Sequence, residues 1–466
     1  MNSRTAYTPR HYQHTAQRWI EEHPRCALFA EMGLGKTVVT LTAVQRLIDA
    51  LEVSRVLIAA PKKVAEATWT DEAAKWQHLS LRVVHVTGTA AQRKQTLAED
   101  ADVYVIGRDS LAWLHDLYVD GKRFRSPFDM VVLDELTTFK NRQAIRWKAA
   151  RDFSRGARRV VGLTGTPTPQ GLQDLWAQMY VIDLGERLGQ SLTRWRDQYF
   201  DCWRRNNIVL KMTPKPHAEE EIRRSIGDIC LTLLAEDNNP LPPMEVIDHV
   251  LDMPEAMAKG YAEFERDSIM QLTDAQGVCE VTAASAAALM NKLAQYTGGA
   301  VYDDSGEWHE VNTLKLGELL HIIGNADSPV LVFYQYRHEA ERIAAAVSGK
   351  RVRRYEGADD LRDWNNGGID VLLAHPASTA FGLNMQHGGH IIVWYGTGWN
   401  LELYQQANAR LHRQGQQQRV TVHRIVCGGT VDIKALAAID RKASGQRSMM
   451  TAMAAAVRRV LAANGA

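Results

Sequence analysis

The sequence predicts an α/β protein with two lobes, each a parallel sheet flanked by helices, and with helical protrusions. Short aliphatic runs alternate with longer segments of helical period, which is typical of parallel strands joined by crossover helices. The alternation occurs twice, in residues 26–165 and 329–426, with a mostly helical region between them. A chain of 466 residues is long enough for about two to four domains with cores of their own.

Strands are predicted where β-branched and aliphatic residues form short runs. In the first lobe we expect them at residues 26–30, 55–60, 82–86, 103–107, 130–134 and 159–165. In the second lobe we expect them at residues 329–334, 351–355, 370–374, 390–395 and 419–426. Residues 172–325 are predicted to be helical, from stretches rich in Trp, Arg and Ala such as 192–205 and 281–296.

The domain boundary is placed in 237-DNNPLPPMEV-246, whose density of Asn and Pro is that of a linker. The N-terminal lobe is assigned to residues 1–236, with a helical protrusion from about residue 172. The C-terminal lobe is assigned to residues 237–466, with a helical insertion at about 254–325 and a helix at the C-terminus.

Composition gives no global sign of a polyanion-binding or membrane protein. Lys and Arg total 55 against 54 Asp and Glu, so a nucleic-acid site would have to be a local patch. The five cysteines never form C-x-x-C, which fits reduced thiols and disfavours disulfides or zinc. No N-terminal apolar segment and no apolar run of about 18 residues occurs, so we expect no membrane contact and a cytoplasmic location.

The segment 30-AEMGLGKT-37 follows a predicted strand and precedes a helical run. It matches the phosphate-binding pattern G-x-x-x-x-G-K-[ST], with alanine in place of the first glycine. Gly33 and Gly35 let backbone N–H groups point at phosphate oxygens, and the next helix adds a positive dipole end. Lys36 would contact the β- and γ-phosphates, and Thr37 would bind Mg²⁺. The alternative, a plain glycine turn, is disfavoured by the order strand, loop, helix.

A later strand, in 131-VVLDELTTFKN-141, ends in two carboxylates. Alone, such a pair is a weak signal, because charged residues make up 23% of the chain. A phosphate loop, however, requires one carboxylate near Mg²⁺ and a second to orient the attacking water. Asp134 and Glu135 supply both at the carboxyl end of a strand, where ligands bind in open α/β sheets.

Two further segments leave alternatives open. Taken alone, the segment 162-GLTGTPTPQGLQDLW-176 predicts only a turn after a strand. The segment 399-WNLELYQQANARLHRQGQ-416 places Arg410 and Arg413 on one face of a predicted helix, one turn after Gln406. These arginines are either a solvated basic face or arginine fingers that reach the γ-phosphate from the second lobe.

In this order the segments resemble the motifs of a Swi/Snf-type ATPase of helicase superfamily two, over essentially the whole chain. In the first lobe the resemblance covers the glutamine motif at 9–20, motif I at 31–37, motif Ia at 56–69, motif II at 133–141 and motif III at 163–176. In the second lobe it covers motif IV at 330–335, motif V at 376–386 and motif VI at 405–416. It implies two RecA-like lobes and resembles the compact prokaryotic and phage members, hence the cytoplasm of a bacterial or phage-infected cell.

The resemblance implies a role for each matched residue. The residues implied to be catalytic are Lys36, Asp134, Glu135, Arg410 and Arg413. Those implied to bind ATP are Gln13, Met32, Gly33, Leu34, Gly35, Lys36, Thr37 and Gln406. Mg²⁺ would be bound by Thr37 and Asp134. Nucleic acid would be contacted by Lys62, Lys63, Thr164, Gly165, Ser378, Thr379 and Asn384.

The implied activity is that of a motor that hydrolyses ATP to move along double-stranded DNA and to remodel DNA or protein–DNA complexes. One departure bears on coupling: motif II reads D-E-L-T, so Thr137 replaces a family histidine thought to link the nucleotide site to motif III. Two alternatives stay open. One is a helicase that separates strands or migrates branches, acting on DNA or RNA. The other is a nucleotide-gated DNA clamp with little turnover. The sequence names no protein partner.

Overall fold

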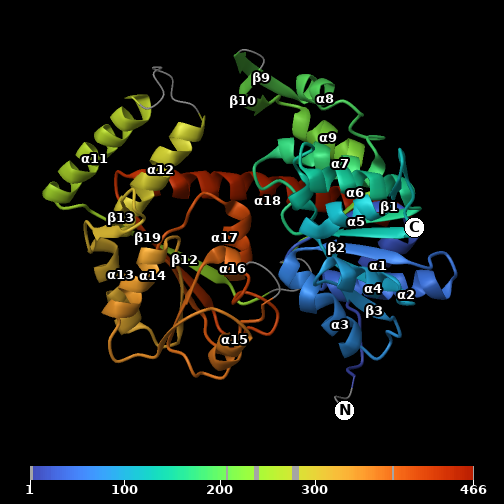
Figure 1. The fold of residues 1–466 in the computed structure, drawn as a ribbon, viewed down its shortest axis with the longest axis horizontal. Helices are drawn as coiled ribbons and strands as arrows, with labels where there is room; N and C mark the ends of the chain where they lie inside the picture. The colour runs from blue at the N-terminus through green and yellow to red at the C-terminus, as the bar shows by residue number, and fades with distance from the viewer. Residues whose placement is uncertain (1–3, 206–207, 236–240, 275–282, 380–382, 465–466) are drawn as a thin grey trace. The chain divides into compact units, whose positions relative to one another are not determined.

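A computed structural model of the chain describes residues 4–205, 208–235, 241–274, 283–379 and 383–464. The chain divides into two compact units (Figure 1). Unit 1 comprises Met1–Pro240 with Lys442–Ala466, and unit 2 comprises Leu241–Arg441. The first division falls inside the linker predicted at 237–246, of which residues 237–240 lie outside the described part.

Unit 1 contains a seven-stranded sheet with the order β11-β1-β8-β7-β2-β4-β3. Every neighbouring pair in it is parallel. The strands are β1 (Arg25–Ala30), β2 (Val56–Ala60), β3 (Val83–Val86), β4 (Val103–Gly107), β7 (Met130–Asp134), β8 (Arg159–Thr164) and β11 (Cys230–Leu233). Most of their residues are buried, as continuous aliphatic runs require when helices cover both faces of a parallel sheet.

Helices cover the two faces of this sheet (Figure 1). On one face lie α5 (Leu111–Leu117), α6 (Ile145–Gly156) and α7 (Leu175–Asp183). On the other lie α1 (His11–Glu22) and α2 (Lys36–Asp49). The helices α3 (Trp69–Lys75) and α4 (Ala90–Leu97) precede β3 and β4.

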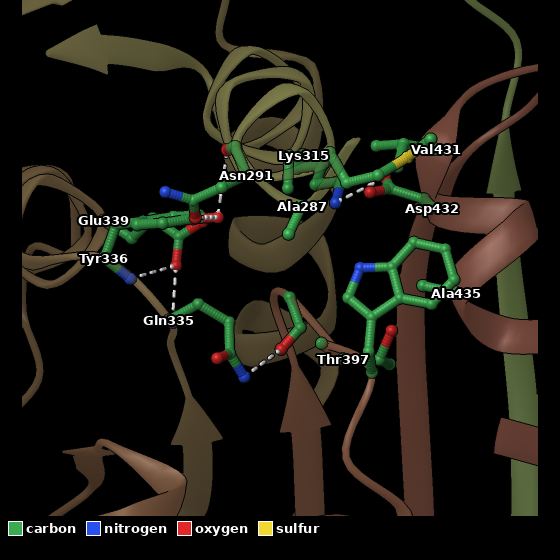
Figure 2. A pocket seen from close by; sticks show the side chains of 15 residues that line it. Ala287, Asn291, Lys315, Gln335, Tyr336, Glu339, Thr397, Val431, Asp432 and Ala435 are labelled. Carbon is green, nitrogen blue, oxygen red and sulfur yellow. Dashed lines mark hydrogen bonds and ion pairs between the residues drawn. The ribbon is translucent and has the colours of Figure 1, made fainter. Parts of the chain in front are cut away.

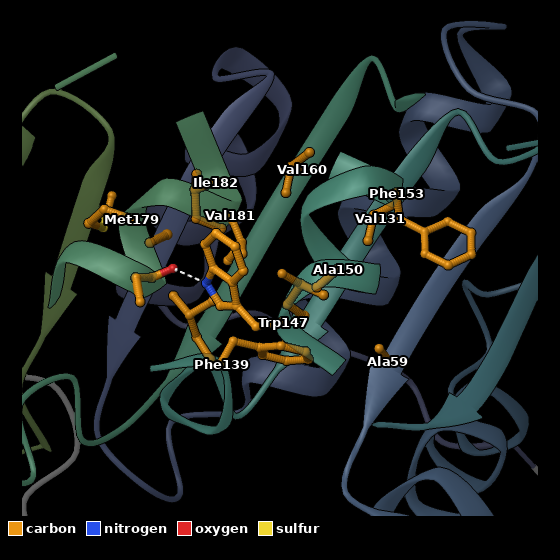
Figure 3. Close-up of a cluster of buried hydrophobic side chains, with 14 of the residues drawn as sticks. Ala59, Val131, Phe139, Trp147, Ala150, Phe153, Val160, Met179, Val181 and Ile182 are labelled. Carbon is orange, nitrogen blue, oxygen red and sulfur yellow. Dashed lines mark hydrogen bonds between the residues drawn. The ribbon is translucent and has the colours of Figure 1, made fainter. Parts of the chain in front are cut away.

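The core of unit 1 packs the segment after β7 against α6 and α7. Figure 3 shows Trp147 of α6 among Phe139, Ala150 and Val181, with its indole N–H donated to the carbonyl of Ala177 at 2.8 Å. A Cβ on Gly162 of β8 would lie 2.7 Å from Leu136 and 2.8 Å from Ile182. The turn that follows Asp134 is thus held by close packing on the neighbouring strand.

Unit 2 contains a six-stranded sheet with the order β12-β19-β18-β15-β17-β16, again with parallel neighbours throughout. Its strands are β12 (Met244–Leu251), β15 (Val330–Phe333), β16 (Val352–Arg354), β17 (Val371–Ala374), β18 (Ile391–Trp394) and β19 (Val420–Cys427). Its helices are α11 (Glu255–Asp274), α12 (Ala283–Gly298), α13 (Leu314–Asn325), α14 (Arg337–Ala346), α15 (Ala358–Asn365), α16 (Pro376–Thr379) and α17 (Leu401–Asn408). Two parallel sheets flanked by helices confirm the predicted fold class, and each predicted strand is present with ends shifted by at most one residue.

The helical prediction for residues 172–325 is wrong in several places. In unit 1, α8 (Leu192–Tyr199) leads into an antiparallel hairpin of β9 (Phe200–Arg205) and β10 (Ile208–Pro214), and α9 (Ala218–Ile226) precedes β11. In unit 2, β12 belongs to the main sheet, and β13 (Ala300–Tyr302) pairs with β14 (Trp308–Glu310). Pairing with a partner strand decides the state of such short runs, and sequence periodicity does not show the partner.

The C-terminal helix is predicted to belong to the C-terminal lobe, but most of it belongs to unit 1. Helix α18 (Val431–Asn464) begins in unit 2, but the residues from Lys442 onward belong to unit 1. The reason is packing, because Met449 and Met453 are buried in the core cluster of unit 1. Among the described residues, no helix combines the length and the apolar character needed to cross a membrane.

Candidate active site

The phosphate loop of unit 1 connects the end of β1 to the start of α2. Gly33 and Gly35 have φ of 81° and 78°, the left-handed backbone that glycine adopts without steric cost. The Lys36 ammonium donates to the carbonyl of Ala30 at 2.7 Å and to that of Glu31 at 3.4 Å. The lysine ammonium therefore lies over the loop.

The other residues of unit 1 that are predicted to bind the nucleotide lie in or beside the phosphate loop. Thr37 is half-buried in the first turn of α2, Met32 is half-buried and Leu34 is buried. Gln13 of α1 is 9% exposed, and it accepts from the backbone N–H of Arg10 at 2.9 Å while its amide donates to the carbonyl of Leu34 at 3.5 Å. Gln13 and the phosphate loop, far apart in sequence, are thus in contact.

A Gly35→Ala substitution tests this loop. A Cβ at position 35 would lie 2.7 Å from the Gln13 amide nitrogen, so we expect weaker ATP binding as well as a loss of about 1–2 kcal/mol of unfolding free energy from the left-handed backbone. Gly189 is the matched control, since its φ is also 78° but a Cβ there would meet no atom within 4 Å. Gly189→Ala should show the stability loss alone. Binding of a fluorescent ATP analogue and urea unfolding give the two readouts, and equal binding by both variants would contradict the assignment.

The acidic pair stands at the end of β7. Asp134 is 8% exposed; one carboxylate oxygen accepts the Trp69 indole N–H at 3.1 Å, and the other accepts the Glu135 backbone N–H at 3.0 Å. Burial raises the pKa of Asp134, while the cations of Lys36 and Arg108 act to lower it. Of these two cations, Lys36 belongs to the phosphate loop, so Asp134 lies near that loop. Such a carboxylate suits Mg²⁺, which binds through one or two carboxylates together with substrate phosphates.

Glu135 carries local backbone strain. Its φ of 52° and ψ of 63° place a residue with a Cβ in the left-handed region, which costs on the order of 1–3 kcal/mol and is typical of functional sites. The turn after it is a short 3₁₀ helix, Leu136–Phe139, in which Thr137 is 1% exposed. Thr137 therefore faces the protein interior.

Among the described residues, no group of three or more His, Cys, Asp or Glu side chains is arranged to hold a metal.

The two residues at the end of β8 that are predicted to contact nucleic acid, Thr164 and Gly165, are buried. Thr164 is fully buried, and its hydroxyl accepts the backbone N–H of Thr166 at 3.1 Å. A Cβ on Gly165 would lie 3.3 Å from the Ala30 carbonyl and 3.6 Å from the Lys36 ammonium. This strand end packs against the phosphate loop because β8 is the neighbour of β1, so Thr164 and Gly165 border the nucleotide site.

Lys62 and Lys63 are exposed just after the end of β2. Lys62 has 81% of its side chain accessible and lies 3.9 Å from Glu66, a surface pair worth about 0–1 kcal/mol. Both lysines precede a π-helical segment, Val64–Thr68, a feature often found at functional sites. Of the predicted nucleic-acid contacts in unit 1, these two are open to a phosphate backbone.

The structure corrects the prediction that the motif VI arginines, Arg410 and Arg413, lie on one face of a helix. Helix α17 ends at Asn408, whose side chain accepts the buried indole N–H of Trp394 at 2.9 Å, and the arginines follow in turns. They nevertheless converge, because Arg410 and Arg413 both donate to the carbonyl of Leu383, at 3.1 Å and 2.8 Å. Their shared location thus comes from the turn and from motif V.

The remaining predicted site residues of unit 2 differ in their exposure to solvent. Gln406 is 1% exposed, with its amide 3.4 Å from the Glu402 carboxylate. Ser378 donates to the carbonyl of His375 at 2.7 Å, and the buried Thr379 donates to that of Pro376 at 3.2 Å. Asn384 is exposed. Residues 380–382 of motif V lie outside the described part of the chain.

A family profile described as the SNF2-related domain matches residues 12–297, more than half of the chain. The chain belongs to the SNF2-related family. The motif resemblance is thereby confirmed: this is a Swi/Snf-type, DNA-dependent ATPase of helicase superfamily two, with ATP as its substrate.

Other similarities extend over most of the chain. "Putative protein p41" of Acyrthosiphon pisum secondary endosymbiont phage 1 is 34% identical over 471 residues, covering 96% of this chain and 99% of that protein. The human DNA annealing helicase and endonuclease ZRANB3 is 25% identical over 451 residues, covering 91% of this chain but only 38% of ZRANB3. A Sulfolobus solfataricus SWI2/SNF2 ATPase core in complex with dsDNA is 20% identical, with a TM-score of 0.46 and 95% of each chain covered.

Unit 2 of this SNF2-related ATPase also contains a cavity of about 680 Å³ at the carboxyl ends of β15 and β18, with a mostly apolar lining and a few buried charged groups (Figure 2). The Lys315 ammonium lies 2.6 Å from Asp432, and both side chains are largely buried. Across the cavity, Glu339 accepts the backbone N–H groups of Gln335 at 2.7 Å and Tyr336 at 3.2 Å. Burial raises the pKa of Glu339 to about 7.

A Glu339→Gln variant should reveal this pKa through stability. The folded protein holds the Glu339 proton more tightly than the unfolded chain, so the parent loses stability as pH rises from about 4.5 to 7. Glutamine does not titrate and can still accept both N–H groups. We expect the variant to gain up to about 3 kcal/mol relative to the parent between pH 5 and pH 8, measured by urea unfolding. A difference that does not change with pH would contradict the shift.

Proposed function

We propose that this SNF2-related ATPase is a motor that moves along double-stranded DNA and remodels DNA or protein–DNA complexes. The observation that carries the proposal is that Lys36, Asp134 and the strained Glu135 all lie at or just after the carboxyl ends of strands in one sheet, β1 and β7, which are separated only by β8. The exposed Lys62 and Lys63 follow the carboxyl end of β2, the strand next to β7. Phosphoryl chemistry and contact with a phosphate backbone would then share one edge. ZRANB3 is by name a DNA annealing helicase, which favours DNA over RNA.

The residues of the site divide the chemistry in a defined way. Gly33, Gly35 and Lys36 would hold the phosphates, and Thr37 with Asp134 would hold Mg²⁺, which neutralises charge on the β- and γ-phosphates when bound. Glu135 would orient the attacking water. Arg410 and Arg413 of unit 2 would act on the charge that develops during hydrolysis. Gln13 would recognise adenine, with Gln406 lining the cleft.

Contact with DNA would be made without reading its sequence. Lysine contacts to phosphates position a protein on a duplex but carry no base information, which suits movement along it. Lys62 and Lys63 would make such contacts in unit 1, with Ser378 and Asn384 in unit 2. Because these contacts are ionic, we expect the affinity for DNA to fall steeply as salt rises.

A triplex-displacement assay beside a forked-duplex unwinding assay tests the proposal. A motor on double-stranded DNA should displace the third strand while leaving the fork paired, and its ATP turnover should rise more with duplex DNA than with single strands or RNA. Lys36→Ala should abolish displacement. Unwinding of the fork would instead identify a helicase. If the protein shows neither activity and binds DNA only in the presence of nucleotide, it is the clamp. Thr137 in motif II is the residue that favours this alternative.

A further inference from the structure

Trp69 lies directly behind the carboxylate proposed to bind Mg²⁺. Its side chain is fully buried, and its indole N–H donates to one oxygen of Asp134 at 3.1 Å. The other oxygen of Asp134 is held by the Glu135 backbone N–H at 3.0 Å. Two donors on two oxygens fix the rotation of the carboxylate about its terminal bond, and each oxygen keeps a further lone pair for a cation.

The helical segment that contains Trp69 begins with the exposed lysines. Residues 62–75 are continuously helical, with a π-helical segment at Val64–Thr68 between Lys63 and Trp69. A π-helical turn carries a wider hydrogen-bonded loop than an α turn, so it changes the direction in which the following side chains point. The backbone at Lys62 also packs against β4, since a Cβ on Gly107 would lie 3.9 Å from the Lys62 Cα. One short, packed element thus joins the solvent at Lys62 to Asp134.

We propose that Trp69 is a positioning residue that orients Asp134 for Mg²⁺ and transmits DNA contact at Lys62 and Lys63 to the metal site. The inference rests on the proposed function, because it requires Mg²⁺ at Asp134 and DNA at the two lysines. A displacement of helix 62–75 by a DNA phosphate moves the indole N–H and rotates the carboxylate. This route runs through motif Ia and does not involve Thr137.

Trp69→Phe removes the N–H donor and keeps an aromatic ring. The matched control is Trp147→Phe, which also removes a buried indole N–H, donated at 2.8 Å to the carbonyl of Ala177 in the same unit. Outer partners of metal ligands typically change metal affinity by about 10–100-fold. We therefore expect Trp69→Phe, but not Trp147→Phe, to weaken Mn²⁺ binding by that factor in the presence of a non-hydrolysable ATP analogue, as titrated by electron paramagnetic resonance. Metal-free binding of the analogue should be equal in both.

Kinetics should separate this role from a general loss of stability. In Trp69→Phe the Mg²⁺ concentration for half-maximal turnover should rise by about 10-fold or more and the stimulation by duplex DNA should fall, with the KM for ATP at saturating Mg²⁺ little changed. If the parent protein is stimulated by DNA while Trp69→Phe matches Trp147→Phe in Mn²⁺ affinity and stimulation, the positioning role is overturned. If the parent itself shows no DNA stimulation, it is the proposed function that fails.

A measurement on the unaltered protein covers the case in which Trp69→Phe does not fold. In ¹⁵N-labelled protein with the ATP analogue bound, Mn²⁺ should broaden one indole N–H signal far more than the others, because Trp69 hydrogen-bonds a metal ligand. That same signal should shift when duplex DNA is added. A broadened indole signal that duplex DNA leaves unmoved would overturn the link to the lysines.

Discussion

An Arg413→Ala variant is expected to bind ATP as the parent protein does and to hydrolyse it about 10³-fold more slowly. An arginine finger contributes about 10³–10⁵ in turnover, so the lower figure corresponds to about 4 kcal/mol of barrier. Arg413 is the better target of the two, because Arg410 is only 7% exposed and also donates to the backbone of Gln406 at 2.9 Å. Steady-state ATP hydrolysis with and without duplex DNA measures the effect.

Arg419→Ala is the control for that experiment. Arg419 belongs to the same unit, has 59% of its side chain accessible and pairs with Glu245 at 3.2 Å, so its loss should leave turnover unchanged. Equal rates for Arg413→Ala and Arg419→Ala would show that the motif VI arginines do not act on the nucleotide, and that the basic cluster around the Leu383 carbonyl has another use.

Replacing Glu135 with Gln should separate nucleotide binding from hydrolysis. General-base groups typically contribute about 10²–10⁴ in rate, and glutamine has nearly the same shape but cannot take a proton from water. We expect a loss of turnover of that size with ATP binding retained, and the variant should remain on DNA in the presence of ATP. Rapid-quench hydrolysis and a fluorescent ATP analogue measure the two steps.

The control for Glu135→Gln is Glu99→Gln, at an exposed carboxylate of unit 1 that pairs with Arg82 at 3.0 Å. It should behave as the parent protein in both assays. A Glu135→Gln variant that hydrolyses ATP at the parent rate would assign the water-orienting role to another group. A variant that no longer binds ATP would instead indicate that the strained turn at Glu135 supports the phosphate loop.

The fold was readable where strands are buried on both faces, because such strands are continuous aliphatic runs bounded by polar residues. The fold could not be predicted in the protrusion that begins at about residue 172. Trp195, Tyr199 and Trp203 recur at helical spacing, yet the first two are buried in the core while Trp203 is 64% exposed on β9. A partner strand ends the helix at Tyr199, and a pairing between segments is invisible to local periodicity.

The nucleotide site was readable because its chemistry is local in sequence: a loop with two glycines and a lysine, and a strand that ends in carboxylates. Its supporting residues are not local. Trp69, in the helical segment after β2, hydrogen-bonds Asp134, and Arg108, directly after β4, acts to lower its pKa. Only the order of strands in the sheet brings these segments near Asp134. The rule that ligands gather at the carboxyl ends of parallel strands could have raised Arg108, which directly follows β4. Nothing comparable indicated the burial of Thr164.

The split composition of unit 1 has a consequence for synthesis on the ribosome. Met449 and Met453 complete its hydrophobic core, yet they are made only after all of unit 2. During translation unit 2 can fold as soon as its last residues emerge, whereas the N-terminal 240 residues must wait with part of their core open. A protein cut after Arg441 should therefore expose apolar surface on unit 1 and aggregate, even though every motif of the ATPase is still present in it.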